Sequence, residues 1–306
     1  MNKQFKTIQQ QVELLEQRGV ATDERTASTL QREGYYAVVN GYGKAFIDTV
    51  ASAEAGDDRY RPGTTFDQIY QLFLFDRELR SITFMALMSV ECTLRAIISY
   101  TFCAHHRRNG AYLERRSYTK QSEYLRGEGA YARDLNNLLD TLESCARSNK
   151  ITGRLDDDYD NARVAWYRDH YDSIPLWVLF SDLTFGNLRY FFALMIGNEQ
   201  REVCNLLRKV CGTTHERRTL TPQGMLADLD ALSDLRNGCA HEERIYNGSF
   251  SKSKYGYPKI VKTLAAYLAE DDERIFMESV REVIARYAGT SPELQRVLDE
   301  AGLTKI

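Results

Sequence analysis

The sequence predicts a mainly α-helical fold, and three observations lead to that prediction. Almost every apolar segment repeats at helical spacing. Proline, which interrupts helices, occurs only five times in 306 residues. Alternation of apolar and polar residues, the pattern of a strand, never persists for long. We therefore expect an all-α helical bundle, built around one long central helix and interrupted by short irregular insertions.

The expected elements follow in order along the chain. An opening helix stops at Gly19, and a second short helix leads into a turn rich in glycine and aromatic residues at 34–46. A long helix over residues 66–102 contains neither glycine nor proline. Its apolar residues cover nearly the whole circumference, which is typical of a helix at the centre of a bundle. Further helical segments are expected over 174–195, 199–211, 222–240 and 271–288, a loop at 247–257, and a last helix opened by Ser291 and Pro292.

Composition describes an ordinary globular protein, with 43% hydrophobic and 27% charged residues. The net charge of −3 excludes a uniformly basic nucleic-acid binder, so any contact with nucleic acid must come from a local patch. No linker or internal repeat divides the chain. We expect one helical domain over residues 1–250 and a C-terminal helical extension over 251–306, packed on the same domain.

Cysteine usage and hydropathy predict a cytoplasmic protein. The six cysteines form no CxxC pair, and several fall inside apolar helical segments, as buried thiols do in a reducing compartment. The N-terminus has no apolar stretch typical of a signal peptide. The most apolar run, residues 81–90, is far shorter than the roughly 20 residues that a bilayer span needs. We therefore expect no contact with a membrane.

One short stretch, "RNGCAHEERIYN" at residues 236–247, contains an unusual arginine. If Met225 is set at 0° on a helical wheel, Arg236 falls at about 20°, inside the apolar stripe. An unpaired guanidinium in the core costs several kcal/mol, so it requires a carboxylate partner or a cleft that binds an anion. No acid stands four residues away, where the neighbours are Leu232 and Ala240.

The residues after this arginine suggest RNA cleavage. Asn237 and His241 lie four residues apart on an adjoining face, separated by three small residues. Histidine can take the proton of a ribose 2′-hydroxyl, and arginine can stabilise the phosphorane that forms. We therefore predict that Arg236, Asn237 and His241 are catalytic and need no metal or cofactor. In the alternative interpretation, Arg236 pairs with a buried acid such as Glu91, and His241 is a surface residue.

Other charged and aromatic residues are weaker candidates. Four arginines in a tyrosine-bearing segment could hold an RNA backbone while the tyrosines stack on bases, or the segment is a solvated helix face. Glu91 and Arg95 stand four residues apart, and this spacing predicts a buried structural pair. His170 either supports the site or packs beside Tyr171 and Trp177. The five histidines form no ligand cluster, so no metal site is expected. The four arginines are Arg107, Arg108, Arg115 and Arg116, and the tyrosines are Tyr112, Tyr118 and Tyr124.

Five blocks of the chain together carry a resemblance to a known family. They are "QQVELLEQRGV" (10–20), "GYYAVVNGY" (34–42), "LFLFDRELRSITFMALMSVECTLRA" (72–96), "HYDSIPLWVLFSDLTFGNL" (170–188) and "LRNGCAHEERIYN" (235–247). In content and order these blocks resemble bacterial abortive-infection (Abi) proteins of the AbiD/AbiF type. That family is assigned to the HEPN superfamily, whose signature R-[NHD]-x3-H matches Arg236, Asn237 and His241. The tryptophan-containing block departs from the family pattern at Ser181, where a glutamate is usual.

The resemblance implies a metal-independent endoribonuclease toxin that acts on RNA in antiphage defence. HEPN nucleases usually place two such motifs together, and this chain has one good copy, so the resemblance also implies a homodimer. An antitoxin protein or a noncoding RNA would be a further partner. Two other functions stay open at this point: a non-catalytic HEPN protein that binds or senses RNA, and a protein-interaction module whose motif only stabilises the bundle.

Overall fold

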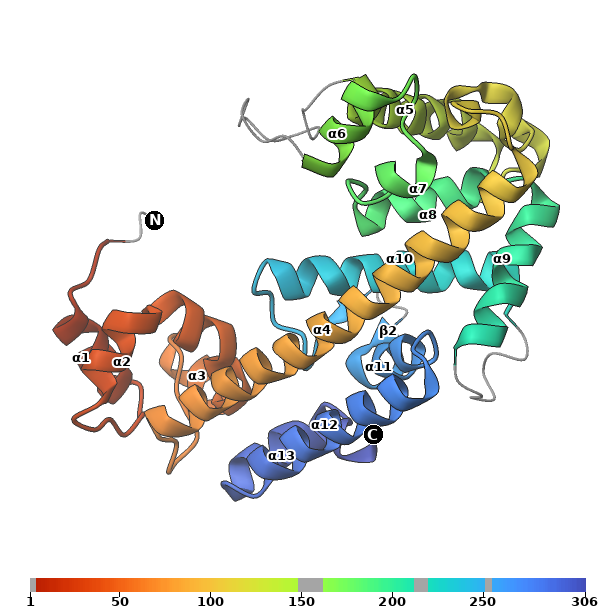
Figure 1. Ribbon diagram of the computed structural model, residues 1–306. Coiled ribbons are helices and arrows are strands. Elements are labelled where there is room, and N and C mark those ends of the chain that lie inside the picture. Colours follow the sequence, from red (N-terminus) through yellow and green to blue (C-terminus); the bar gives the residue numbers. More distant parts are fainter. Residues whose placement is uncertain (1–3, 148–161, 212–219, 251–254) are drawn as a thin grey trace. The chain divides into compact units, whose positions relative to one another are not determined.

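The computed structural model describes residues 4–147, 162–211, 220–250 and 255–306, and this part of the chain is all-α apart from one short hairpin (Figure 1). It forms two compact units. Unit 1 comprises Met1–Thr83, Gly238–Gly248 and Met277–Ile306, and unit 2 comprises Phe84–Asn237 and Ser249–Phe276. The division expected at residue 250 remains a prediction.

The longest helix is α4 (Phe66–His105), with 40 residues. Its first part belongs to unit 1 and the remainder to unit 2. The prediction of a long central helix is confirmed, but not every apolar residue on its circumference is buried. Met85, Met88 and Tyr100 are 69%, 41% and 66% exposed. An apolar circumference in the sequence therefore includes one face that the described chain leaves open.

By length and composition alone, α4 could also cross a membrane. Its most apolar 18-residue window has a mean hydropathy of 1.5, and 44% of that window is buried inside the protein. The apolar part of this helix is therefore longer than the run at 81–90 indicated. The finding is weak support for a membrane span, because the core helix of a soluble protein passes the same test.

Unit 1 begins with helices whose ends the sequence specifies. In α1 (Ile8–Gln17), Thr7 and Gln10 form a reciprocal capping box at the start, and Gly19 adopts a φ of 91° just after the end. The last helix, α13 (Pro292–Glu300), opens with Ser291 as N-cap. Between them lie α2 (Thr26–Glu33), a π-helical turn (Tyr36–Asn40), a 3-10 turn (Gly43–Phe46), α3 (Thr49–Ala55) and the first part of α4, and a 3-10 turn (Leu303–Lys305) ends the chain.

Unit 2 is built around the second part of α4. Aromatic rings form its core: the Phe191 ring lies 5.1 Å from Phe102 and 4.9 Å from Phe180, and the Tyr118 ring packs 5.8 Å from Phe102. The helices of this unit are α5 (Glu128–Arg147), α6 (Ala162–His170), α7 (Leu176–Leu179), α8 (Phe185–Leu194), α9 (Gly197–Val210), most of α10 (Pro222–Ala240), α11 (Tyr257–Ala265) and the start of α12 (Glu270–Ala288).

Residues 247–257 differ from the loop that the sequence predicts. Strands β1 (Ser249–Phe250) and β2 (Tyr255–Gly256) pair antiparallel, with Phe250 opposite Tyr255. Helix α11 begins directly afterwards at Tyr257, with Pro258 in its first turn. Proline fits there because the first N–H groups of a helix have no partner within it.

Candidate functional site

The predicted motif lies at the C-terminal end of α10. Arg236 and Asn237 occupy its last turns in unit 2, whereas the residues from Gly238 onward belong to unit 1. The helix ends where Glu242 adopts a φ of 57° and the Glu243 N–H donates to the Gly238 carbonyl at 2.9 Å. This pattern is a Schellman end, and it makes His241 the residue that closes the helix.

Arg236 is half-buried rather than fully buried, so the wheel argument is only partly right. Its guanidinium carbon lies 6.0 Å from the centre of the Phe84 ring. The Nε atom is buried without a hydrogen-bond partner. Within the described residues Arg236 makes no ion pair. Its positive charge is therefore held near the protein surface without an acid to neutralise it.

The acid suggested as a partner for Arg236 is used elsewhere. Glu91 is buried, and its carboxylate contacts Arg95 one helical turn later, at 2.5 Å. The same guanidinium donates to the Leu183 carbonyl at 2.7 Å, which ties α4 to the chain between α7 and α8. Glu91 and Arg95 thus form an ion pair inside unit 2, and Arg236 is not part of it.

Asn237 and His241 are both exposed, and neither makes a side-chain hydrogen bond within the described residues. The small residues between them are packed by the chain itself: a Cβ on Gly238 would meet Glu243 and Ile245 at 3.8 Å. Burial raises the pKa of the neighbouring Cys239 thiol to about 12, so this sulfur stays protonated and unreactive at neutral pH. The imidazole of His241 is exposed and is therefore accessible to a ligand.

A buried polar network in unit 1 holds the segment that follows the motif. Asp76, which is fully buried on α4, accepts the backbone N–H groups of Ile245 at 3.1 Å and Tyr246 at 2.7 Å. The Tyr42 hydroxyl donates to the same carboxylate at 2.8 Å, and Arg80 pairs with it at 2.5 Å. Residues from three of the five sequence blocks therefore meet at one carboxylate.

Sequence reasoning missed this network, although a signal for it was present. Asp76 and Arg80 stand four residues apart at the edge of an apolar stretch, which is the same spacing that identified Glu91 and Arg95. What the sequence could not show is that the carboxylate reaches a backbone segment 169 residues away.

The tyrosine-bearing segment does not offer its rings to RNA. Tyr112, Tyr118 and Tyr124 are all about 5% exposed, and the segment forms short 3-10 turns (Ala111–Leu113, Arg115–Ser117 and Gln121–Glu123) instead of a helix. The suggestion that these tyrosines stack on bases is therefore wrong, because their rings are packed in the core.

The four arginines of this segment differ in what they contact. Arg108 and Arg116 both pair with Glu114, and Arg115 donates to the Asn136 side chain. Arg107 is exposed and makes no hydrogen bond or ion pair within the described residues. Of the four, Arg107 is the one whose charge is available to a ligand without breaking an existing contact.

His170 packs against a different tryptophan from the one expected. Its ring stacks on Trp166 at 4.6 Å, and its Nδ1 lies 2.7 Å from the Trp166 carbonyl oxygen on the same helix, α6. The contact is local, since the two residues are one helical turn apart.

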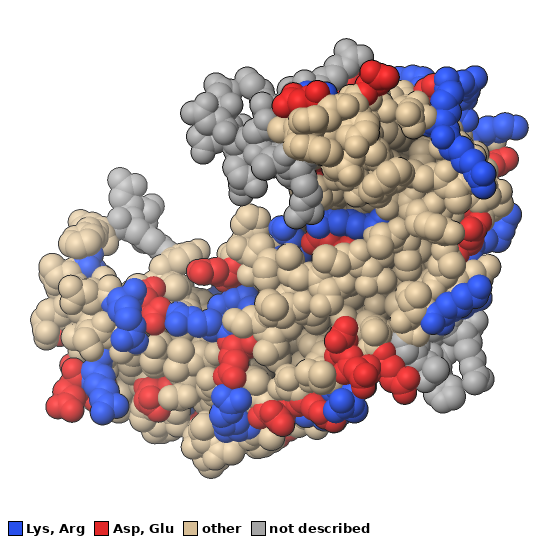
Figure 2. Space-filling view, viewed as in Figure 1, with Lys and Arg blue, Asp and Glu red and all other residues tan. Residues whose placement is uncertain are grey.

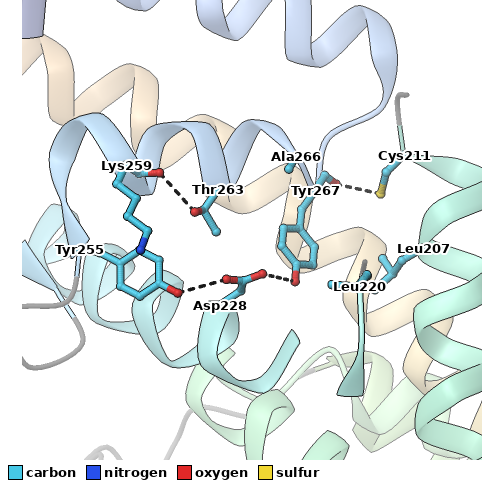
Figure 3. Close-up of a pocket in the computed structure, with 9 residues that line it drawn as sticks. All are labelled: Leu207, Cys211, Leu220, Asp228, Tyr255, Lys259, Thr263, Ala266 and Tyr267. Atoms are coloured by element: carbon cyan, nitrogen blue, oxygen red, sulfur yellow. Dashed lines mark hydrogen bonds between the residues drawn. The ribbon is translucent and has the colours of Figure 1, made fainter. Parts of the chain in front are cut away.

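Unit 2 also contains a pocket of about 250 Å³ between α9, α10 and α11 (Figure 3). Its polar groups bond to one another: the hydroxyls of Tyr267 and Tyr255 point at the Asp228 carboxylate from 3.0 and 3.4 Å, and Cys211 contacts the Tyr267 carbonyl. Burial raises the pKa of Tyr267, so its hydroxyl remains a donor. These mutual bonds are typical of a structural network.

Comparison with known proteins assigns the chain to a family. The family described as Abi-like protein matches residues 28–247, more than half of the chain, and the chain therefore belongs to that family. The matched region contains the Asp76 network and the whole stretch from Arg236 to His241. Membership points to a role in abortive-infection defence. No curated protein and no solved structure matches the chain.

Proposed function

We propose that this protein is a metal-independent endoribonuclease of the HEPN type that acts in the cytoplasm as a toxin in abortive infection. The observation that supports the proposal is the state of Arg236: a half-buried guanidinium, beside an aromatic ring, with no acid to neutralise it among the described residues. A cation in this state attracts an anion, and RNA supplies one at every phosphate.

The motif residues would share the chemistry as follows. His241 takes the proton of a ribose 2′-hydroxyl, and the 2′-oxygen forms a bond to the adjacent phosphorus. Arg236 donates to the phosphorane oxygens that carry the extra charge. The bond from phosphorus to the 5′-oxygen then breaks, and that oxygen receives a proton from the imidazolium of His241 or from water. The products are a 2′,3′-cyclic phosphate and a 5′-hydroxyl. Asn237 would orient the imidazole of His241 or hold a phosphate oxygen.

A second copy of the chain would complete the site, because one chain supplies one motif. The open face of α4 in unit 2 offers a surface for it. Every exposed residue of this helix between 84 and 100 is uncharged, and Figure 2 shows a surface without charge along the middle of α4. Exposed apolar side chains gathered on one helix face are typical of an interface. The face consists of Met85, Met88, Ser89, Cys92, Ala96 and Tyr100.

This open face is complementary to itself in antiparallel packing. If a twofold axis passes beside Cys92, Met85 lies opposite Tyr100 of the second copy, and Ser89 lies opposite Ala96. Small residues then face each other near the axis, and the larger pair closes each end. The face also adjoins Phe84, whose ring contacts Arg236. The interface would therefore bring each chain's arginine near the second copy.

The proposed activity is tested by incubating the purified protein with total bacterial RNA in EDTA and analysing the fragment ends. We expect cleavage with 2′,3′-cyclic phosphate ends from the wild type and none from His241→Ala. The matched control is His105→Ala, which removes a histidine bonded to Glu202 at 2.7 Å and should leave cleavage unchanged. RNA binding without cleavage by the wild type would favour an RNA-sensing protein, and neither binding nor cleavage would favour a protein-interaction module.

A further inference from the structure

Unit 2 has a hollow at the C-terminal end of α4 that the motif does not explain. Its walls are the end of α4 with the following loop on one side and residues 173–177 on the other. The volume is about 190 Å³. At about 30 Å³ for each water, the hollow has the volume of roughly six water molecules, which is the scale of one planar heterocycle.

The walls of the hollow are fixed to each other. The buried Tyr112 hydroxyl donates to the Ile174 carbonyl at 2.8 Å and so joins the two sides. The Tyr118 hydroxyl donates in turn to the Tyr112 carbonyl at 2.6 Å. Gly110 makes the loop turn with a φ of 73°, a conformation that other residues rarely adopt. The hollow is therefore preformed and does not have to be opened by a ligand.

The inner part of the hollow is uncharged or already paired. Phe102 is buried, and burial raises the pKa of Cys103 to about 11, so its thiol is neutral. His106 contacts the buried Glu199 at 2.7 Å, and its tilted ring packs against Phe102 with 4.4 Å between the ring centres. A charged or strongly polar ligand group would find no free partner at these positions.

The rim differs from the interior because it carries an exposed aromatic ring and an exposed cation. Trp177 lines the hollow and is 61% exposed. Arg107 lines it as well and has no partner within the described residues, whereas the adjacent Arg108 pairs with Glu114. An exposed indole and an unpaired guanidinium on the same hollow match the two ends of a nucleotide, since a base can stack on the ring and its phosphate can bind the cation.

We propose that this hollow holds one unpaired nucleobase of an RNA strand, stacked on Trp177, with the adjoining phosphate bound by Arg107. The inference rests on the proposed function and specifies its substrate as single-stranded or looped RNA. Bases inside a duplex are stacked on their neighbours and cannot enter a space for one ring. The hollow thus binds the RNA strand through residues other than Arg236, Asn237 and His241.

Tryptophan fluorescence tests the stacking directly, because the chain has only two tryptophans, Trp166 and Trp177. In Trp166→Phe the sole tryptophan is Trp177, and excitation at a wavelength that tyrosine does not absorb makes it the sole emitter. We expect titration with a 2′-O-methyl single strand of mixed sequence, which cannot be cleaved, to quench this emission to saturation. In Trp177→Phe the remaining reporter, Trp166, should not respond. Equal quenching of Trp177 by a blunt RNA duplex would overturn the proposal.

Affinity for the same strand gives a second readout. Stacking of one base changes affinity by roughly 5- to 150-fold. Trp177→Ala should weaken binding within that range, and Trp177→Phe should recover most of it. Trp166→Ala is the matched control, since Trp166 is also exposed, at 48%, but lies on α6 outside the hollow, and its affinity should match the wild type. Circular dichroism must show that each variant is folded.

These outcomes separate the hollow from the catalytic proposal. Quenching of Trp177 by RNA in a protein that never cleaves would leave the nucleobase site standing and remove the ribonuclease mechanism. Cleavage with unchanged affinity in a folded Trp177→Ala variant would overturn the nucleobase site alone.

Discussion

The carboxylate of Asp76 accepts the backbone N–H of Tyr246 at 2.7 Å. A second N–H, from Ile245, reaches the same carboxylate at 3.1 Å. Both donors follow the motif by a few residues, and the acceptor is a fully buried side chain on α4. Within unit 1, one carboxylate therefore fixes the course of the chain just after His241.

The first prediction concerns the stability of this arrangement. In Asp76→Ala, Arg80 would remain 7% exposed without its acid, and two buried N–H groups would lose their acceptor. Removing one partner of a buried ion pair typically costs about 3–5 kcal/mol. We expect urea denaturation to show a loss of free energy of unfolding in that range.

The matched control for Asp76→Ala is Asp57→Ala. Asp57 also contacts an arginine, Arg18, at 2.6 Å, but its side chain is 45% exposed. Exposed pairs contribute about 0–1 kcal/mol, so this variant should unfold close to the wild type. Equal losses in the two variants would show that the buried carboxylate has no special role.

Local sequence signals account for much of the fold. Ser291 with Pro292 marks the start of α13, and Gly19 marks the end of the first helix, because caps and left-handed glycines act through neighbouring residues alone. The pairing of β1 with β2 was not foreseen, because strands of two residues carry no periodicity. Helix α11 was also missed, although Ile260, Val261, Leu264 and Ala265 stand at helical spacing. The open face of α4 was missed for another reason: hydropathy cannot distinguish apolar residues in a core from those at an unoccupied surface.

At the candidate site, too, the sequence predicted local features but not the packing between distant segments. Helical spacing drew attention to Arg236 and His241, because it describes contacts along one helix. It could not decide whether Arg236 pairs with Glu91, since that depends on packing between distant segments, and Glu91 in fact contacts Arg95. Composition also suggested that Tyr112 would face RNA, but its side chain is buried. The sequence alone does not indicate which side of a short turn is buried.

The second prediction concerns salt dependence. Each phosphate contact on a single strand contributes about 0.7 to the slope of log affinity against log salt. Arg107→Gln removes an unpartnered cation and should reduce the magnitude of that slope by about 0.7. Arg116→Gln is the control with the same change of charge, but Arg116 is paired with Glu114, so its slope should change less. Identical slopes for the two variants, measured by titration at several salt concentrations, would contradict a phosphate contact at Arg107.

The third prediction concerns the open face of α4. Cys92 is exposed, whereas burial raises the pKa of the thiols of Cys103, Cys145 and Cys204 to about 11, so these stay protonated at pH 8. If two copies pack antiparallel beside Cys92, mild oxidation should join them through this residue. We expect a cross-linked dimer on a non-reducing gel, absent in Cys92→Ser and retained in Cys103→Ser. A monomer in light scattering at micromolar concentration, with no cross-link, would remove this face as the interface.

The fourth prediction separates catalysis from stability at Arg236. Because its guanidinium makes no ion pair or hydrogen bond among the described residues, Arg236→Ala leaves no acid unpaired, and we expect the free energy of unfolding to fall by less than about 1 kcal/mol. Cleavage should nevertheless be lost, because no other group would offer its charge to the phosphorane. Arg236→Lys keeps the charge without the planar donors and should recover only part of the rate.

His241→Ala provides the comparison for Arg236→Ala. Loss of a proton-transfer group lowers the rate by roughly 10²–10⁴-fold, and an exposed histidine contributes little to folding. Both variants should therefore have a free energy of unfolding close to that of the wild type while failing to cleave RNA, and both should abolish toxicity in cells.

RNA affinity distinguishes the two variants. Arg236→Ala should bind RNA more weakly, since it loses a phosphate contact, and His241→Ala should bind RNA as the wild type does. If Arg236→Ala instead unfolds several kcal/mol more easily and binds RNA normally, the arginine is structural, and the interpretation of the motif as a stabiliser of the bundle is the right one.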